Sequence, residues 1–510
     1  MTTLVAKFSP TRMPFRFVTA AVLTSLSCIY TLSVCAAWGG IDFSFDDSWI
    51  HLQYARTIFE GRPWEYASGI PSTGSSAPLW SIVLAPVFLL GYEHDTVVGA
   101  VLLIASAFFV IDTFLVGELI NHHTKNWAVA VMGQAVFVLV PRNAGLMLSG
   151  MEAPLSIMML ILALVLLPKP GWRYDIALGA VAGLAYLTRP EFFLIAALLL
   201  PTRAIWGLYR DRTAKRVLSV LAMFCIAAVI VLPWVLHCLS VTGLPLADSY
   251  YSKLRWGVSD YDILLWNGWW SYWMSTDVFL AAGFVGSAFM VLNKKPAEPL
   301  MLLSLTALYR LTMPGMSMLF DARYLVPLFD LLAVCFVMGV FFILDMIIRE
   351  IPRTRPSDRA LLTLAVILLV FGPSVSSIQL HTNIHGNQAS NIREMQWYLS
   401  EWVSANVPED AVIASYDIGA LGYLAKATVI DVYGLVTPEV LHNRTTTFRV
   451  ADYLKEIDCD YVMYYVEWFP GLGSAMESRG AEFELLIQAH LDDNVVCGSN
   501  NMAVWRVTWT

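Results

Sequence analysis

The sequence predicts a mainly α-helical membrane protein with many spans, followed by a C-terminal extracytoplasmic α/β domain. Two observations on its 510 residues favour the membrane part: 57% are hydrophobic and only 14% are charged. The mean hydropathy of +0.61 agrees with them. An ordinary soluble domain carries about 25% charged residues, so this deficit indicates a polytopic membrane protein. The formal net charge of −8, without any block of Lys and Arg, argues against a nucleic-acid partner.

The first apolar run covers about 17–38 and follows the basic residues Lys7, Arg12 and Arg16. It is longer than the apolar part of a secretion signal, and no clear A-x-A cleavage site follows it. We therefore expect a retained transmembrane helix whose N-terminus lies in the cytoplasm of a cell-membrane protein. Further apolar runs of helical length lie at about 96–120, 126–143, 152–168, 174–188, 191–202, 218–237, 277–292, 299–313, 325–346 and 361–378.

Two of these runs, 174–188 and 191–202, are short for a bilayer and predict a tilted or broken hairpin interrupted at Pro190. The basic loops 203–216, 293–295 and 349–359 are expected in the cytoplasm. This orientation holds along the chain only if the short segment 77–91, which contains two prolines, is interfacial or re-entrant. The prediction is then about eleven crossings.

This topology places the loop 39–76 outside and divides the chain into a transmembrane domain, 1–378, and an extracytoplasmic domain, 379–510. In the second domain, 411–436 reads as strand, glycine turn, short helix and strand, as in an α/β domain. The segment 391–406 before it has helical periodicity. Cys459 and Cys497 could form a disulfide there if the compartment is oxidising.

An acidic pair, Asp46 and Asp47, follows the first span directly. Adjacent carboxylates repel each other and are costly beside lipid, so they need a reason. One carboxylate could accept a proton from a sugar hydroxyl while its neighbour sets its pKa or helps to order a cation. The alternative is that Asp46 caps a helix beginning near Ser48. A capping role needs one Asp, and His51 and Arg56 follow the pair closely.

Cationic side chains are predicted on the same outer face. Lys253 follows Tyr250 and Tyr251 beside a membrane edge, where it could hold a lipid phosphate or, with the tyrosines, serve as an interfacial anchor. Arg189 lies between two short helices, where it could be functional or pair with Glu191 or Glu152. Arg323 lies at the outer end of a span, where it could be functional or snorkel to the interface. The gathering of these groups on one face favours a site.

The acidic pair in its "DDSWIHLQYAR" context, with "SSAPLW" after it, resembles the GT-C glycosyltransferases that use polyprenyl-phosphate sugars. Further stretches with the same resemblance are "SGMEAPL", "GLAYLTRPE", "TGLPLADSYYSKL", "RYLVP" and "SYDIGALGYL…VIDVYGLV". Within these enzymes the chain looks like the bacterial terminal arabinofuranosyltransferases, and it is similar, more remotely, to aminoarabinose and protein-mannosyl transferases. "PLADSYYSKL" departs from the "PNT" that relatives more often show before the aromatic residue and lysine. The resemblance spans nearly the whole chain and implies a GT-C fold.

The resemblance also implies an activity: transfer of a sugar, with inversion, from a polyprenyl-phosphate donor to a glycan, lipid or protein acceptor on the outer face. Asp46, which has the superfamily's spacing from Gly61, would act as general base, and Asp47 would tune it or help to bind the acceptor or a divalent cation. The residues implied at the lipid phosphate are Lys253, Arg189, Arg323 and Tyr251. Further candidates are His51, Arg56, Glu152, Glu191 and Tyr250.

A second hypothesis is a transporter or flippase of lipid-linked sugars. Such a protein would carry ionisable residues near the middle of the bilayer and pseudo-symmetric halves. Here the candidates gather at one face, no internal repeat is visible, and a sizeable outer domain follows. These features favour the transferase.

Overall fold

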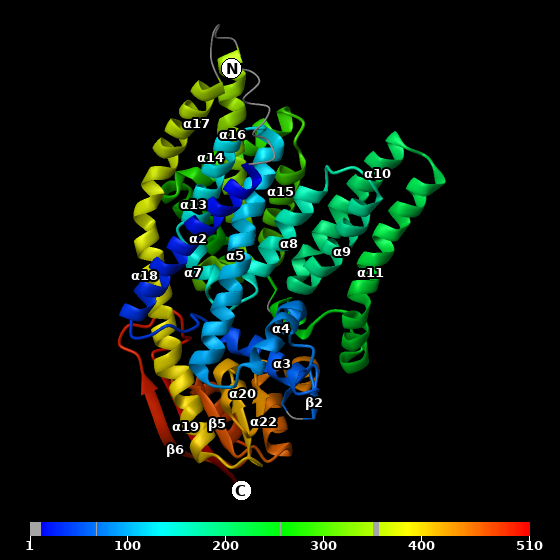
Figure 1. Ribbon diagram of the computed structural model, residues 1–510. Helices are drawn as coiled ribbons and strands as arrows, with labels where there is room; N and C mark the ends of the chain where they lie inside the picture. The colour runs from blue at the N-terminus through cyan, green and yellow to red at the C-terminus, as the bar shows by residue number, and fades with distance from the viewer. Residues whose placement is uncertain (1–11, 68, 255–256, 350–355) are drawn as a thin grey trace.

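The computed structural model describes residues 12–67, 69–254, 257–349 and 356–510 (Figure 1). Its helices form a bundle, and a sheet domain lies at the end opposite the start of α2. The helices of the bundle are α2 (Arg12–Ala37), α5 (His94–Thr124), α6 (Trp127–Leu139), α7 (Asn143–Met147), α8 (Ala153–Leu166), α9 (Trp172–Thr188), α10 (Leu200–Arg210), α11 (Ala214–Thr242), α13 (Asp260–Thr276), α14 (Val278–Leu292), α15 (Ala297–Thr312), α16 (Val326–Arg349), α17 (Pro356–Phe371) and α18 (Val375–Ile392). The predicted fold class, a membrane helix bundle with a C-terminal α/β domain, is confirmed.

The number of crossings is not confirmed. Among the described residues, six helical segments are long and apolar enough to cross a bilayer, or seven if the bent pair α13 and α14 counts as one span. Helices also cover the other predicted runs, but α6, α8 and α9 have only 13, 14 and 17 residues. A straight span needs about 20 residues. Part of the basic loop 349–359, residues 350–355, lies outside the described residues.

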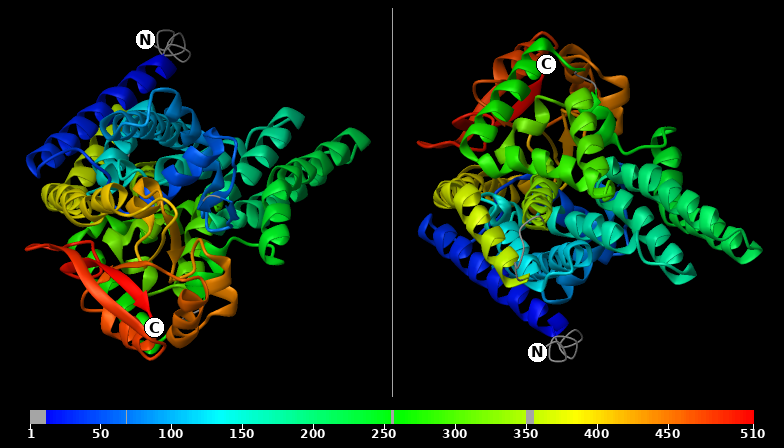
Figure 2. Two further views of the ribbon diagram at one scale, coloured as in Figure 1. Left: turned by 90° about the horizontal axis from the view of Figure 1, so that it is seen from below. Right: turned by 90° about the horizontal axis from the view of Figure 1, so that it is seen from above.

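The segment after Pro190 is longer than expected. The sequence predicted a short run, 191–202, whereas the helical segment extends from Pro190 to Arg210 and is apolar enough to cross. Proline fits the first turn of a helix, where its missing N–H is not needed. The expected basic loop therefore begins after Arg210. Both views of Figure 2 place α11, which follows it, on the side of the bundle opposite α2.

The core of the bundle is α16, and 72% of its most apolar window is buried. It packs against α14 with very little separation at two glycines, because a Cβ on Gly339 would lie 2.2 Å from the Cα of Gly286. Small residues allow such close approach of membrane helices. The loop 39–76, which we call the outer loop after the side that the sequence predicts, folds into α3 (Asp47–Phe59), β1 (Glu65–Ala67) and β2 (Ile70–Pro71). The segment 77–91, which the sequence predicts not to cross, contains α4 (Pro78–Leu84) and η1 (Ala85–Leu89).

The C-terminal domain is a five-stranded sheet covered by helices. Its strands are β3 (Val412–Ser415), β4 (Thr428–Asp431), β5 (Tyr461–Tyr465), β6 (Ala481–His490) and β7 (Asn501–Trp509), in the order β4-β3-β5-β7-β6. Its helices are α19 (Tyr398–Asn406), α20 (Gly419–Leu424), α21 (Pro438–Asn443), α22 (Thr447–Glu456) and α23 (Phe469–Glu477). β3 is parallel to β4 and β5, with Ile413 opposite both Val429 and Tyr461. The strand–helix–strand prediction for 411–436 is confirmed as β3, α20 and β4.

The two cysteines of this domain are not joined in the structure. Cys459 is buried in the core on one face of the sheet, and its thiol donates to the carbonyl of Tyr461 at 3.1 Å. Cys497 packs against the core on the other face, with its Sγ 3.3 Å from Oε1 of Gln396. The sheet separates the two thiols, so the disulfide that the sequence allowed is not formed here.

α20 docks the C-terminal domain onto the outer loop. Both carboxylate oxygens of Asp46 accept hydrogen bonds from the start of this helix, from the backbone N–H groups of Gly419 at 2.6 Å and Ala420 at 2.8 Å. Burial and, next, the carboxylate of Asp417 raise the pKa of Asp46, although these two hydrogen bonds oppose the shift. Asp46 occupies the N-cap position of α3 but makes no side-chain capping bond there. It serves a different helix, 373 residues further along the chain.

Further bonds support the same docking. Tyr66 donates its hydroxyl to the carbonyl of Ile418 at 2.6 Å, and Arg56 donates to the carbonyl of Tyr423 at 2.7 Å. Glycine is required at this contact, because a Cβ on Gly422 would lie 2.3 Å from the hydroxyl of Tyr66. The glycines of "IGALGYL" therefore allow α20 to lie directly on α3 and β1.

Gly419→Ala is expected to destabilise this docking. Its Cβ would lie 1.9 Å from the backbone oxygen of Asp46, so α20 would have to move. Such overpacking costs about 1–3 kcal/mol, measured as a lower unfolding midpoint of the purified protein. Gly471→Ala is the matched control, because nothing lies within 4 Å of its Cβ position and it lies in α23. Equal midpoints for the two variants would contradict the docking role.

Candidate functional site

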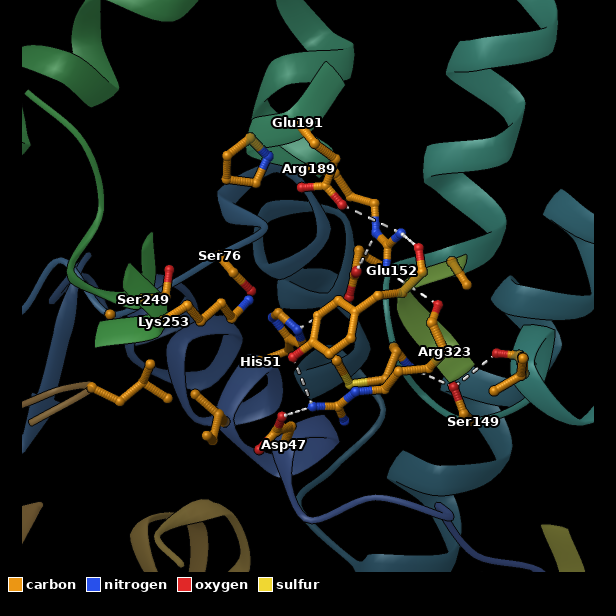
Figure 3. A pocket seen from close by; sticks show the side chains of 18 residues that line it. Asp47, His51, Ser76, Ser149, Glu152, Arg189, Glu191, Ser249, Lys253 and Arg323 are labelled. Carbon is orange, nitrogen blue, oxygen red and sulfur yellow. Dashed lines mark hydrogen bonds and ion pairs between the residues drawn. The ribbon is translucent and has the colours of Figure 1, made fainter. Parts of the chain in front are cut away.

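A narrow pocket lies where ends of the bundle helices meet the outer loop (Figure 3). It encloses about 80 Å³. Charged and polar side chains from five separate parts of the chain line it: Asp47, His51, Ser76, Ser149, Glu152, Arg189, Glu191, Ser249, Lys253 and Arg323. Seven of these are residues that the sequence singled out. The expectation that they gather at one place is met for them.

Asp47 is the first residue of α3 and reaches into the pocket. It forms an ion pair with Arg323, yet 42% of its side chain stays exposed, compared with 9% for Arg323. The guanidinium of Arg323 also lies 4.9 Å from the ring centroid of Phe45 and 4.8 Å from that of Phe320. Arg323 is therefore held in place, and Asp47 presents an accessible carboxylate beside a fixed positive charge.

Arg189 and Glu152 form a buried ion pair in the part of the pocket farther from Asp47 in Figure 3, with Nε and Oε1 2.8 Å apart. Nη1 of Arg189 also lies 3.5 Å from Oε1 of Glu191, and Nε2 of His51 lies 3.5 Å from Oε2 of Glu152. Burial alone would raise the pKa of Glu152, but Arg189 and His51 outweigh burial and hold this pKa well below its ordinary value. Glu152 is thus an anion whose charge fixes Arg189.

Tyr324 lies at the centre of the cationic groups, although the sequence did not rank it as a candidate. Its ring centroid is 4.7 Å from Nζ of Lys253, 5.1 Å from Cζ of Arg323 and 5.9 Å from Cζ of Arg189. Cations within about 6 Å of an aromatic face are attracted to it. Arg189 and Arg323 each have a carboxylate partner, whereas Lys253 has none in the described part of the chain. Lys253 is therefore the cation most available to an anionic ligand.

The backbone before Arg323 is left-handed. Phe320, Asp321 and Ala322 have φ values of 55°, 54° and 57°. Each such non-glycine residue costs about 1–2 kcal/mol, and outliers of this kind gather at functional sites. Asp321 is held by His381 at 3.0 Å and by Arg142 at 3.7 Å. The turn brings Arg323 to Asp47, and no composition signal in the sequence predicts it.

Four predicted residues lie outside the lining of this pocket: Asp46, Arg56, Tyr250 and Tyr251. Asp46 and Arg56 hold α20, as described above. The ring centroids of Tyr250 and Tyr251 lie 5.7 Å apart, and those of Tyr251 and His442 lie 6.2 Å apart. The structure gives these tyrosines packing contacts next to the pocket, on the same helix as Lys253, α12 (Asp248–Leu254).

A divalent cation was one expected partner of the acidic pair. Among the described residues, no group of three or more His, Cys, Asp or Glu side chains is arranged to hold a metal ion. Asp47 is paired with Arg323, and both oxygens of Asp46 accept backbone N–H groups.

Comparison with solved structures shows that the chain shares its fold with two proteins of known structure. An oligosaccharyltransferase from Archaeoglobus fulgidus, solved with a tethered acceptor peptide, matches with a TM-score of 0.61 and 13% identity over 94% of this chain and 73% of that one. The oligosaccharyltransferase AglB from the same organism, solved with an inhibitory peptide and a dolichol-phosphate, gives a TM-score of 0.57 at 13% identity over 93% and 73% of the two chains.

ArnT from Cupriavidus metallidurans, bound to undecaprenyl phosphate, matches with a TM-score of 0.57 and 12% identity over 96% of this chain and 97% of that one. At 12–13% identity these similarities concern the fold. Residues 383–505 also match a family described as a domain of unknown function, DUF8728. A comparison with curated proteins finds no match.

Proposed function

We propose that the protein is a membrane glycosyltransferase that moves a sugar from a polyprenyl-phosphate donor to an acceptor hydroxyl, with inversion at the anomeric carbon. The observation that carries the proposal is one pocket lined by the accessible carboxylate of Asp47 and by Lys253, whose ammonium has no carboxylate partner among the described residues. The fixed guanidinium groups of Arg189 and Arg323 line the same pocket. An acceptor hydroxyl needs a base, and a lipid-phosphate leaving group needs cations. The pocket offers both.

In the proposed reaction, Asp47 takes the proton of the acceptor hydroxyl as the hydroxyl oxygen attacks the anomeric carbon. The bond between that carbon and the phosphate oxygen breaks, and the lipid phosphate leaves with an additional negative charge. Lys253, Arg323 and Arg189 stabilise this charge as it develops, which is the largest contribution in many enzymes. Glu152 fixes Arg189 through their 2.8 Å contact and is a positioning residue.

Asp47 takes the role that the sequence analysis gave to Asp46. The spacing from Gly61 favours Asp46, whereas the hydrogen bonds of the two side chains favour Asp47. Both oxygens of Asp46 are engaged by Gly419 and Ala420, whereas 42% of the Asp47 side chain is accessible in the pocket. A base must reach its proton at hydrogen-bond distance, so access favours Asp47.

The fold neighbours support the choice of donor. The structure of ArnT contains undecaprenyl phosphate, and one structure of AglB contains a dolichol-phosphate. For this chain we propose a polyprenyl phosphate in the same chemical role, on the outer side of a cell membrane. Arg203, Arg210, Lys215 and Arg216 around the connection of α10 and α11 support a cytoplasmic location for the opposite end of the bundle.

Lys253→Met is expected to weaken binding of undecaprenyl phosphate by about 10- to 100-fold, since a charge-assisted contact to phosphate is lost. The measurement is titration of the purified protein in lipid nanodiscs with undecaprenyl phosphate. Lys426→Met is the matched control, because Lys426 pairs with Glu409 on the C-terminal domain and is 61% exposed. Equal affinity of the Lys253 variant and wild type would remove Lys253 from the donor site.

A further inference from the structure

A second and larger pocket, of about 550 Å³, lies beyond the ion pair of Asp47 and Arg323. These two residues line both pockets, so the proposed base stands between them. One side of the second pocket comes from the outer loop and the segment 316–323, and the other comes from the C-terminal domain. Binding pockets of small molecules span about 300–1,000 Å³, so this one has room for a ligand of one or two sugar rings.

The topology of the sheet places this pocket at a characteristic binding position. The chain leaves β3 through α20 and pairs next as β4, toward one edge of the sheet. After β5 it continues in the opposite direction along the strand order, to β6 and β7 near the other edge. Ligands of open α/β sheets bind outside the carboxyl ends of adjacent strands at such a change of direction. Tyr416 and Asp417 follow β3 directly. Tyr465 is the last residue of β5, and Trp468 lies shortly after it. All four line the second pocket.

Aromatic rings form one wall. Tyr416 and Trp468 meet edge to face with centroids 5.2 Å apart, and Tyr465 meets Trp468 at 4.7 Å. Trp468 is 41% exposed although it belongs to this cluster. A sugar ring presents an apolar face of C–H bonds and a rim of hydroxyl groups. An exposed aromatic ring beside polar groups fits such a ligand.

The polar side of the pocket accepts hydrogen bonds. Oδ2 of Asp417 accepts from Tyr465 and, at 2.9 Å, from Gln396. Its Oδ1 accepts none from the described residues and remains open to a hydroxyl donor. Asp46, Asp47 and Asp417 give the lining three carboxyl groups, with Arg323 as its one cation among the described residues.

We propose that this second pocket binds the acceptor and that the acceptor is a carbohydrate, stacked on Trp468 and Tyr416 and hydrogen-bonded to Asp417. The pocket then holds the reacting hydroxyl at Asp47, opposite the donor. This inference rests on the proposed function for its reaction, whereas the binding of a saccharide by the pocket is a separate property.

Two other acceptor classes fit this pocket less well. A phosphate-bearing lipid is disfavoured, because Arg323, the one cation of this lining among the described residues, is already paired with Asp47. One common way for an extended peptide to bind a protein with a sheet is to add a strand at the sheet edge. The edges of this sheet are β4 and β6, whereas the pocket lies at the ends of the inner strands β3 and β5.

The test is binding of a panel of pentose and hexose methyl glycosides and their short oligosaccharides to the full chain in nanodiscs, observed by saturation-transfer NMR. At least one saccharide is expected to bind, and Trp468→Ala and Tyr416→Ala are each expected to weaken it by about tenfold. The matched control is Phe448→Ala, which removes a ring that is 60% exposed on α22 and does not line the pocket. A second variant, Asp417→Asn, tests the hydrogen bond without removing a ring.

Binding of no saccharide, or equal binding by wild type and both ring variants, would overturn the inference. Binding of Ser- and Thr-containing peptides that is lost in Trp468→Ala would also overturn it and identify a peptide acceptor. The two proposals fail separately. Saccharide binding without any affinity for undecaprenyl phosphate would contradict the donor, and the reverse result would contradict the carbohydrate acceptor.

Discussion

Replacing Asp47 with asparagine is expected to lower the rate of sugar transfer by about 10²–10⁴-fold, the usual contribution of a general base. The amide keeps the size of the side chain and a polar group beside Arg323, so the variant should fold with an unfolding midpoint close to that of wild type. Membranes that contain the protein are given a panel of labelled polyprenyl-phosphate sugars. The measurement is the amount of polyprenyl phosphate released and of labelled glycan formed.

Asp46→Asn is the matched control, because it makes the same chemical change one residue away. Its amide nitrogen would face N–H groups of Gly419 or Ala420, so the docking of α20 should weaken and the unfolding midpoint should fall. The turnover of the folded fraction should remain. The opposite outcome, with Asp46→Asn inactive and Asp47→Asn active, would return the base to Asp46. Movement of lipid-linked sugar without transfer would support the flippase instead.

Arg189→Met is expected to have the largest effect on stability. It would leave Glu152 buried without its cation, since the two side chains are only 6% and 7% exposed. Removing one partner of a buried ion pair costs about 3–5 kcal/mol. Arg189 also donates to the carbonyl of Tyr324 at 3.1 Å, so the turn that carries Arg323 would loosen. A thermal unfolding experiment in detergent should show a clearly lower midpoint.

The double variant Arg189→Met with Glu152→Gln is expected to recover part of this loss, because no uncompensated charge remains. Arg444→Met serves as the surface control, since Arg444 also pairs with carboxylates, Glu439 and Glu456, but on the exposed face of the C-terminal domain. A midpoint for Arg189→Met as high as that of Arg444→Met would show that the buried pair is not structurally important.

Local patterns predicted the elements of this chain well. The apolar runs marked the helices of the bundle, and "AVIASYDIGALGYLAKATVIDVYGLV" marked β3, α20 and β4. The positions of Lys253, Arg189 and Arg323 beside the outer ends of spans followed from charge and hydropathy. The predicted count of about eleven crossings stays unconfirmed, because α6 and α8 are too short to be identified as spans by length.

The geometry of the site depended on contacts that sequence patterns do not contain. Asp46 and Asp47 are adjacent and chemically identical, and only the folded chain shows that one serves α20 and the other the pocket. The left-handed turn at 320–322 contains no glycine, so the sequence does not predict it. Asp417 and Trp468 join the site because β3 and β5 lie side by side, although 51 residues of sequence separate these two side chains.

Mass spectrometry of the lipids that remain bound to the purified protein would show directly whether it binds a polyprenyl-phosphate donor. Wild type is expected to retain a polyprenyl phosphate or a polyprenyl-phosphate sugar, and Lys253→Met, purified in parallel, is expected to retain much less of it. The mass of the retained donor would also identify its sugar. Equal lipid profiles for the two proteins, with no polyprenyl phosphate in either, would contradict the assignment of the pocket to a polyprenyl-phosphate donor.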